Sequence, residues 1–178
     1  DLHLKGFEAL GAKIELKEGY ISAFAPDGLK AANVLFPSVS VGATENILMA
    51  ATLADGKTTI SNAAREPEIA DLAYCLQKMG AEIEGIGSDT LTVIGKKSLH
   101  AADYQVIPDR IETATYAVAA AITGGDILLK GTRLELIESV ADVLMSAGIS
   151  ISEIEDGIWV SNPSGRIRGI DGVTEPYP

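Results

Sequence analysis

The chain contains few of the residues on which metal and redox sites depend. Its 178 residues include one cysteine, Cys75, and two histidines, His3 and His100. A single cysteine cannot form an internal disulfide, and ligands this far apart in sequence do not have the spacing of a zinc site. The sequence therefore predicts a cytoplasmic protein and disfavours metal catalysis.

The chain also lacks a surplus of positive charge and a long apolar run. Its 14 Lys and Arg residues stand against 25 Asp and Glu residues, which gives a formal net charge of −11. Proteins that coat nucleic acids need surplus cations to displace counterions from phosphate. The longest apolar run, 114–122, is about half of what a bilayer helix requires. We therefore expect neither a nucleic acid nor a membrane partner.

An internal repeat organises the sequence. The segment 44–56 matches 113–125, which lies 69 positions later. The segment 79–83 matches 147–151, and 10–14 matches both. The chain thus holds two full units of about 68 residues and the tail of a third, as expected of a repeat architecture.

The residue periods within each unit predict the order β-α-β-α-β-β. The expected elements are 31–36, 44–54, 58–60, 68–79, 82–85 and 90–94 in the first unit, and 104–107, 111–123, 127–130, 135–147, 149–154 and 158–161 in the second. This alternation indicates an α/β (α+β) fold. Because helices 44–54 and 111–123 are apolar almost all round, we expect both to be buried on every side, as in an inside-out α/β barrel.

The turn 40–44 is the first candidate site. It lies between a predicted strand and a predicted helix, where free backbone N–H groups attract anions. Gly42 would let a phosphate approach the backbone closely. The alternative is structural: Ser40 or Thr44 would simply cap the helix.

Two charged segments precede other helices. The segment 65–68 opens a helix with acids that complement its dipole, but 134–137 at the matching position lacks this pattern, so folding does not require it. In the second unit, Asp109 and Glu112 resemble a capping box, which would direct Arg110 outward to hold an oxyanion. Capping alone is the structural alternative at this position.

Three segments carry a family resemblance. Ser40–Thr44, Asn62–Ile69 and Pro108–Thr113 closely resemble UDP-N-acetylglucosamine enolpyruvyl transferases. Asp1–His3 also resembles the segment that follows the catalytic loop of that family. The likeness covers the whole chain. The related shikimate-pathway (3-phosphoshikimate) enolpyruvyl transferases share the repeat and remain an alternative, although the Asn62–Ile69 run is not expected in them.

The resemblance implies a fold of two domains, each built from three β-α-β-α-β-β units around buried helices. Residues 1–107 would belong to one domain and residues 108–178 to the other, with a hinge near 107–108. The chain begins at Asp1 without a methionine. We therefore expect it to be the central fragment of a longer chain, whose remainder would be its partner.

The implied reaction transfers the enolpyruvyl group of phosphoenolpyruvate to the 3′-hydroxyl of UDP-N-acetylglucosamine, the first committed step of peptidoglycan precursor synthesis. These two compounds are the expected substrates, and the chemistry needs no metal or redox cofactor. The catalytic cysteine of the family precedes the segment matching Asp1, and its aspartate base follows Pro178. No catalytic residue is therefore expected within this chain, which should be inactive alone.

The resemblance also assigns substrate contacts. Asp1 and Leu2 would line the uridine site, and the nucleotide and diphosphate would be bound by Val39, Ser40, Val41 and Gly42. Ser38 departs from the lysine found in some members of the family. Cleft-orienting charges would come from Glu66, Glu68 and Arg110. The alternative from another class is a noncatalytic nucleotide-binding or scaffold domain.

Overall fold

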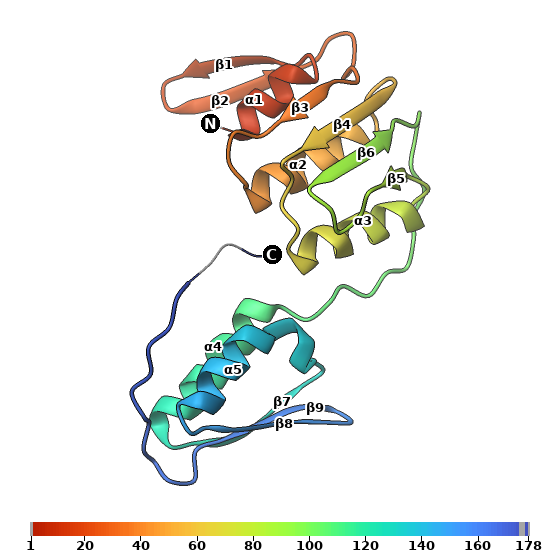
Figure 1. Ribbon diagram of the computed structural model, residues 1–178. Helices are drawn as coiled ribbons and strands as arrows, with labels where there is room; N and C mark the ends of the chain where they lie inside the picture. Colours follow the sequence, from red (N-terminus) through yellow and green to blue (C-terminus); the bar gives the residue numbers. More distant parts are fainter. Residues whose placement is uncertain (1, 175–176, 178) are drawn as a thin grey trace. The chain divides into compact units, whose positions relative to one another are not determined.

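The computed structural model describes residues 2–174 and 177, which separate into two compact units (Figure 1). The first unit comprises residues 2–106 and Tyr177, and the second comprises residues 107–174. Their assignment to different domains of the family stays a prediction. Among the described residues, no helix is long and apolar enough to cross a membrane.

The first unit contains the tail of one repeat and a complete second repeat. Helix α1 (Leu2–Ala9) leads into a two-stranded antiparallel sheet of β1 (Lys13–Lys17) and β2 (Tyr20–Phe24). The complete repeat then consists of β3 (Asn33–Leu35), α2 (Val41–Ala51), β4 (Lys57–Ser61), α3 (Pro67–Lys78), β5 (Glu82–Glu84) and β6 (Thr90–Ile94). The expected order β-α-β-α-β-β is confirmed in this repeat. Its sheet has the order β3-β4-β6-β5, in which only β3 and β4 are parallel.

Helix α2 lies at the centre of the first core. Ile47 and Leu48 are fully buried, as are Ile60 on β4 and Leu91 on β6. Only Met49 within the helix is an exposed position, at 43%. Each fully buried side chain of this size stabilises the fold by about 1.5–3 kcal/mol. The predicted first helix is therefore mostly buried, but Met49 and Leu53 within the range 44–54 are exposed, so it is not buried on every side.

The second unit places two helices on one face of a three-stranded sheet (Figure 1). Its elements are α4 (Arg110–Thr123), β7 (Asp126–Lys130), the short 3-10 helix η1 (Leu134–Ile137), α5 (Glu138–Ser146), β8 (Ser150–Ile154) and β9 (Gly157–Ser161). The sheet order is β7-β9-β8 and both pairings are antiparallel. Ile158 and Val160 on β9 are fully buried beneath the helices.

The prediction that helix 111–123 is buried on every side is wrong for the described chain. The buried face of α4 consists of Thr113, Ala117, Ala120 and Ala121. The opposite face is exposed and carries Ile111, Tyr116, Val118 and Ile122. One sheet and α5 cover only one side of this helix, and the described residues form no closed barrel.

The predicted strand 104–107 is also wrong. These residues form no strand, and a side chain anchors the segment instead: the Tyr104 hydroxyl donates to Asp71 Oδ1 at 2.7 Å. The ammonium group of Lys78 lies 6.0 Å from the centre of the Tyr104 ring. Pro108, just beyond, has no N–H to contribute to a sheet.

The expected helix 135–147 divides into η1 and α5. At their junction Ile137 has φ −128°, which departs from helical geometry. The carboxylate of Glu153 on β8 accepts a hydrogen bond from the Leu134 N–H at 3.0 Å. This bond holds the start of η1 to the sheet, so the chain makes a tight turn before α5 begins.

The connection between the first and second helices of a repeat, after β4 or β7, is bonded to a hairpin in both repeats. Asn62 after β4 and Gly131 after β7 both have positive φ, 57° and 71°. The N–H of Ala63 donates to Asp89 O at 2.9 Å, and the N–H of Gly131 donates to Asp156 O at 2.8 Å. Each connection is thus bonded to the tip of the hairpin in its own unit.

Candidate functional site

The first turn of α2 has the geometry of a capped helix start. Ser40 is extended, with φ −148° and ψ 116°, and its Oγ accepts from the Ala43 N–H at 3.4 Å. The helix begins at Val41, three residues before the expected start. The structural alternative, a Ser40 cap, is therefore confirmed. The cap leaves the amides of Val41 and Gly42 without an intrahelical acceptor, because the first turn of any helix has none.

Gly42 lies beside His3 of α1. A Cβ atom at position 42 would lie 3.2 Å from His3 Cε1. The Nδ1 atom of the same ring is 2.7 Å from Nδ2 of Asn46, one turn further along α2. The structure therefore joins the start of α1, where Leu2 lies, to the start of α2.

The other proposed substrate-binding residues differ in exposure. Ser38 and Val39 are exposed in the loop before α2, and 53% of Val39 is accessible. Val41 and Leu2 are half-buried, and both pack against the core of the first unit. The Val39 side chain is thus available to a ligand, whereas Val41 offers mainly its backbone amide. Asp1 lies outside the described residues.

A second group of candidate residues lies at the start of α3. Glu66 is the residue before the helix, Pro67 opens it and Glu68 is in the first turn. The Oε2 atom of Glu66 is buried and, within the described part of the chain, has no hydrogen-bond partner. Burial and the nearby Glu68 carboxylate raise the pKa of Glu45 on α2. Acidic groups of α2 and α3 therefore lie close together.

In the second unit, Arg110 is the first residue of α4. The Asp109 side chain accepts from the N–H groups of Ile111 and Glu112, at 2.8 and 3.1 Å. The predicted cap by Asp109 is therefore confirmed. A pocket of about 370 Å³ lies beside this helix start and is lined by Pro108, Asp109, Glu112, Thr113, Tyr116, Leu128, Leu129, Lys130 and Thr132.

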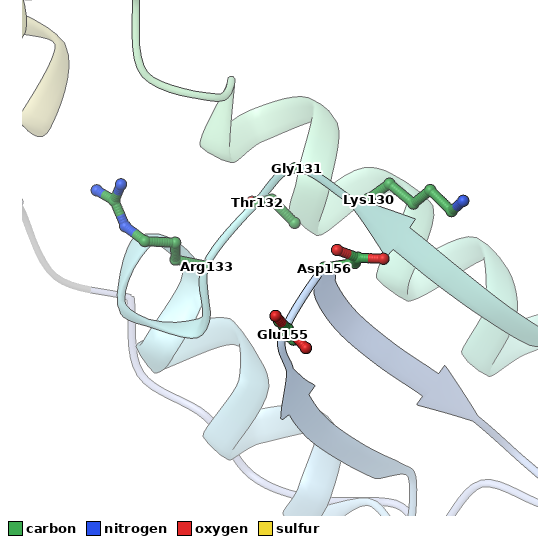
Figure 2. Close-up of a pocket in the computed structure, with 6 residues that line it drawn as sticks. All are labelled: Lys130, Gly131, Thr132, Arg133, Glu155 and Asp156. Carbon is green, nitrogen blue, oxygen red and sulfur yellow. The ribbon is translucent and has the colours of Figure 1, made fainter.

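A larger pocket of about 510 Å³ lies between the end of β7 and the β8–β9 turn (Figure 2). It is lined by Lys130, Gly131, Thr132, Arg133, Glu155 and Asp156. Figure 2 shows the Lys130 and Arg133 side chains extending in opposite directions. Arg133 Nε bonds Glu135 Oε1 at 2.7 Å. The two cations therefore do not converge on a ligand. No group of three His, Cys, Asp or Glu residues that could hold a metal ion occurs among residues 2–174 and 177.

Comparison with known proteins identifies the family. The sequence model of the protein family described as EPSP synthase (3-phosphoshikimate 1-carboxyvinyltransferase) matches residues 1–176 of this chain. The chain belongs to the EPSP synthase family. Within this family the chain is 61% identical over 178 residues to the UDP-N-acetylglucosamine 1-carboxyvinyltransferase of Paramagnetospirillum magneticum. It is 57% identical over 178 residues to the enzyme of the same name from Acidiphilium cryptum. The chain spans only 41% and 42% of the lengths of these two relatives.

Two solved structures of enolpyruvyl transferases share the fold. The enolpyruvyl transferase NikO from Streptomyces tendae superposes with a TM-score of 0.73 at 21% identity, over 90% of this chain and 41% of that one. EPSP synthase from Acinetobacter baumannii gives a TM-score of 0.64 at 22% identity, over 90% of this chain and 38% of that one. These matches confirm the expected fold class, and the sequence relatives confirm the resemblance to UDP-N-acetylglucosamine enolpyruvyl transferases.

His3 lies near the candidate site, and the sequence predicts no role for its side chain. One histidine in a sequence has many structural roles, so its presence alone carried no assignment. A comparison of the repeats could have marked this residue. The positions that match His3 in the next two repeats are Leu72 and Val140. An imidazole at a position that is otherwise apolar marks a departure from the repeat.

Proposed function

We propose that this chain is the central part of a UDP-N-acetylglucosamine 1-carboxyvinyltransferase. The reaction transfers the enolpyruvyl group of phosphoenolpyruvate to the 3′-hydroxyl of UDP-N-acetylglucosamine. The observation that carries the proposal is the 61% identity over all 178 residues to an enzyme of that name. The identity to the 3-phosphoshikimate-type structure is only 22%.

The start of α2 is proposed to bind the diphosphate of the sugar nucleotide. The free amides of Val41 and Gly42 point along the helix axis, where the helix dipole adds roughly half a positive charge. Glycine at position 42 leaves room for a phosphate oxygen next to the backbone. The accessible Val39 and, from α1, Leu2 are proposed to contact the uridine, together with Asp1.

The chemistry proceeds by addition and elimination. A proton is added to the methylene carbon of phosphoenolpyruvate, and the neighbouring carbon becomes electrophilic. The sugar hydroxyl adds to that carbon and loses its proton to a base. Phosphate then leaves the tetrahedral intermediate as the methyl group returns a proton, which restores the vinyl bond. The reaction as a whole needs an acid, a base and cations for phosphate and carboxylate.

The charged residues at the starts of α3 and α4 are proposed to orient the substrates. The buried Oε2 atom of Glu66 favours this role, because a buried acceptor without a donor costs about 1–3 kcal/mol. A hydroxyl or amide donor supplied on substrate binding would recover that cost. Glu68 and Arg110 are assigned the same orienting role from the family resemblance.

The diphosphate assignment is tested by Gly42→Val in the protein at the length of its relatives. The branched side chain would block the approach of phosphate to the backbone, and we expect the affinity for UDP-N-acetylglucosamine to fall by about 1–3 kcal/mol. Because a Cβ atom would lie 3.2 Å from His3, a thermal melt must accompany the titration. Ile111→Val, at the matching position of the second unit, is the control. Unchanged affinity in folded Gly42→Val would remove the assignment.

The proposal also predicts that these 178 residues do not turn over alone. Phosphate release from phosphoenolpyruvate is measured with UDP-N-acetylglucosamine present, for this chain and for the protein at the length of its relatives. We expect release only from the longer protein. If this chain alone turned over at about 10 s⁻¹, an ordinary enzymatic rate, its catalytic residues would lie within 1–178.

A further inference from the structure

His3 joins two segments that the proposed function assigns to the same ligand. Its Nδ1 atom is 2.7 Å from Asn46 Nδ2, and its Cε1 atom faces Gly42. An amide nitrogen only donates hydrogen bonds, so Nδ1 accepts this one and the proton of the neutral ring is on Nε2. The ring is therefore fixed in one tautomer and in one orientation against the first turn of α2.

The two helices approach closely at this point. Gly6, one turn after His3 on α1, lies so near Ile47 that any Cβ atom there would overlap the isoleucine side chain. Ile47 is fully buried, and α1 packs against α2. Apolar packing thus holds the middle of the helix pair, and the His3–Asn46 hydrogen bond holds its end beside Gly42.

The positions that match His3 and Asn46 elsewhere in the chain carry other residues. Leu72 and Val140 occupy the positions matching His3, and both pack partly buried against their own cores. Thr115 matches Asn46, and its hydroxyl donates to the carbonyl of Ile111 in its own helix. The glycine and the amide therefore occur on α2 and not at the matching positions of α4, and the imidazole occurs on α1 and not at the matching positions of α3 and α5.

We propose that His3 is a positioning residue, which holds the Ser40–Gly42 turn in the orientation that receives the diphosphate. This inference rests on the proposed function. His3 acts through Gly42 and Asn46, and the binding groups remain the backbone amides of α2. Loss of the His3–Asn46 bond lets the turn adopt other orientations, which weakens binding of the nucleotide without altering the chemical step.

The test compares variants in the protein at the length of its relatives. His3→Leu introduces the residue found at position 72 and removes the hydrogen bond, and Asn46→Ala removes the donor. We expect each to raise KM for UDP-N-acetylglucosamine about tenfold, the effect of one lost hydrogen bond, with kcat and KM for phosphoenolpyruvate unchanged. Because the residues act as one pair, the double variant should be no worse than either single variant.

Two further variants separate positioning from a general structural role. The Oδ1 atom of His3→Asn can replace Nδ1 as acceptor, so this variant should recover most of the lost affinity. Thr115→Ala, at the position matching Asn46, should leave both KM values unchanged. Melting temperatures of all variants are measured alongside.

The outcomes distinguish this inference from the proposed function. If Gly42→Val weakens nucleotide binding and His3→Leu leaves it unchanged, the positioning role is wrong and the diphosphate turn stands. If neither variant affects binding, the diphosphate turn itself is wrong. A fall in kcat for His3→Leu, or equal losses for both substrates, would also overturn the positioning role.

Discussion

Thr44 and Thr113 occupy the same position in successive repeats and make the same hydrogen bond. The hydroxyl of Thr44 donates to the carbonyl of Ser40, and that of Thr113 donates to the carbonyl of Asp109, both at 2.8 Å. In both cases the acceptor belongs to the residue that caps the helix. Both threonines are buried, with 0% and 8% of their surfaces exposed.

Each threonine also contacts the connection that follows β4 or β7 in its unit. Thr44 Oγ1 accepts from the Ala64 N–H at 3.0 Å, and Thr113 Oγ1 lies 3.1 Å from Thr132 Oγ1. The start of the first helix is therefore hydrogen-bonded to the connection that follows β4 or β7 in each unit. This shared bond keeps the proposed diphosphate turn in a fixed relation to the start of α3, where Glu66 lies.

Thr44→Val should destabilise the protein by about 1–3 kcal/mol. Valine keeps the shape but leaves the buried Ala64 N–H without its acceptor, and such a group costs its full desolvation energy. Urea denaturation of the protein at the length of its relatives measures the change. Thr115→Val, which alters an exposed threonine, should stay within about 0.5 kcal/mol. Equal effects from the two variants would contradict a specific role for Thr44.

Asp109→Ala should cost about 0.5–2 kcal/mol of stability, the usual range for loss of a helix cap. The carboxylate accepts two amide hydrogens, and alanine accepts neither. Asp109→Asn retains an acceptor oxygen and serves as the matched control. Chemical denaturation should rank the wild type and the asparagine variant together above the alanine variant. Equal stability of all three would show that water replaces the cap.

Tyr104→Phe should change how stability depends on pH in alkaline solution. Burial and the hydrogen bond to Asp71 raise the pKa of Tyr104 from 10.0 to about 12. A raised pKa gives stability that is fully present below pH 10 and is lost as pH rises to about 12, because the unfolded chain loses its proton first. The wild type should therefore lose more stability than the phenylalanine variant between pH 10 and 12. Parallel denaturation curves across this range would contradict the assignment.

Glu68→Gln should lower the pKa of Glu45 toward its ordinary value. Burial raises this pKa, and the Glu68 charge raises it further. Glutamine removes the second cause and leaves the first, so a raised pKa should persist in smaller degree. NMR titration of the Glu45 side chain measures both values, with Glu84→Gln on β5 as a control. An identical Glu45 pKa in wild type and Glu68→Gln would show that burial alone raises it.

The element order was predictable because short periods and turn residues determine it locally. Strand β6 (Thr90–Ile94) was predicted residue for residue from its alternating pattern. Helix α2 begins three residues before the predicted start, since Val41 and Gly42 are poor helix formers and the sequence alone does not decide between Ser40 and Thr44 as the cap. The prediction of a strand at 104–107 is wrong because a strand needs a neighbouring strand to pair with. The segment is held instead by the hydrogen bond from the Tyr104 hydroxyl to Asp71.

The candidate site was only partly predictable for a different reason. The turn at Ser40–Gly42 could be found because capping residues and glycine have local signatures. The contact between His3 and Gly42 joins residues 39 positions apart, and no pattern within either segment predicts it. Likewise, the exposed face of α4 could not be foreseen from its composition. The sequence of an apolar helix indicates that its faces should be buried, but it does not indicate which segments of the chain bury them.

The hydrogen bond between each connection, after β4 or β7, and the hairpin of the same unit limits where the chain can accept an insertion. The β5–β6 tip is exposed, yet Asp89 O holds the Ala63 N–H, so an epitope tag inserted beside Asp89 would displace the connection leading to α3. The turn at Glu18 and Gly19, between β1 and β2, is also exposed, and a Cβ atom on Gly19 would meet no other atom. A label or affinity sequence for following this protein in cells belongs there.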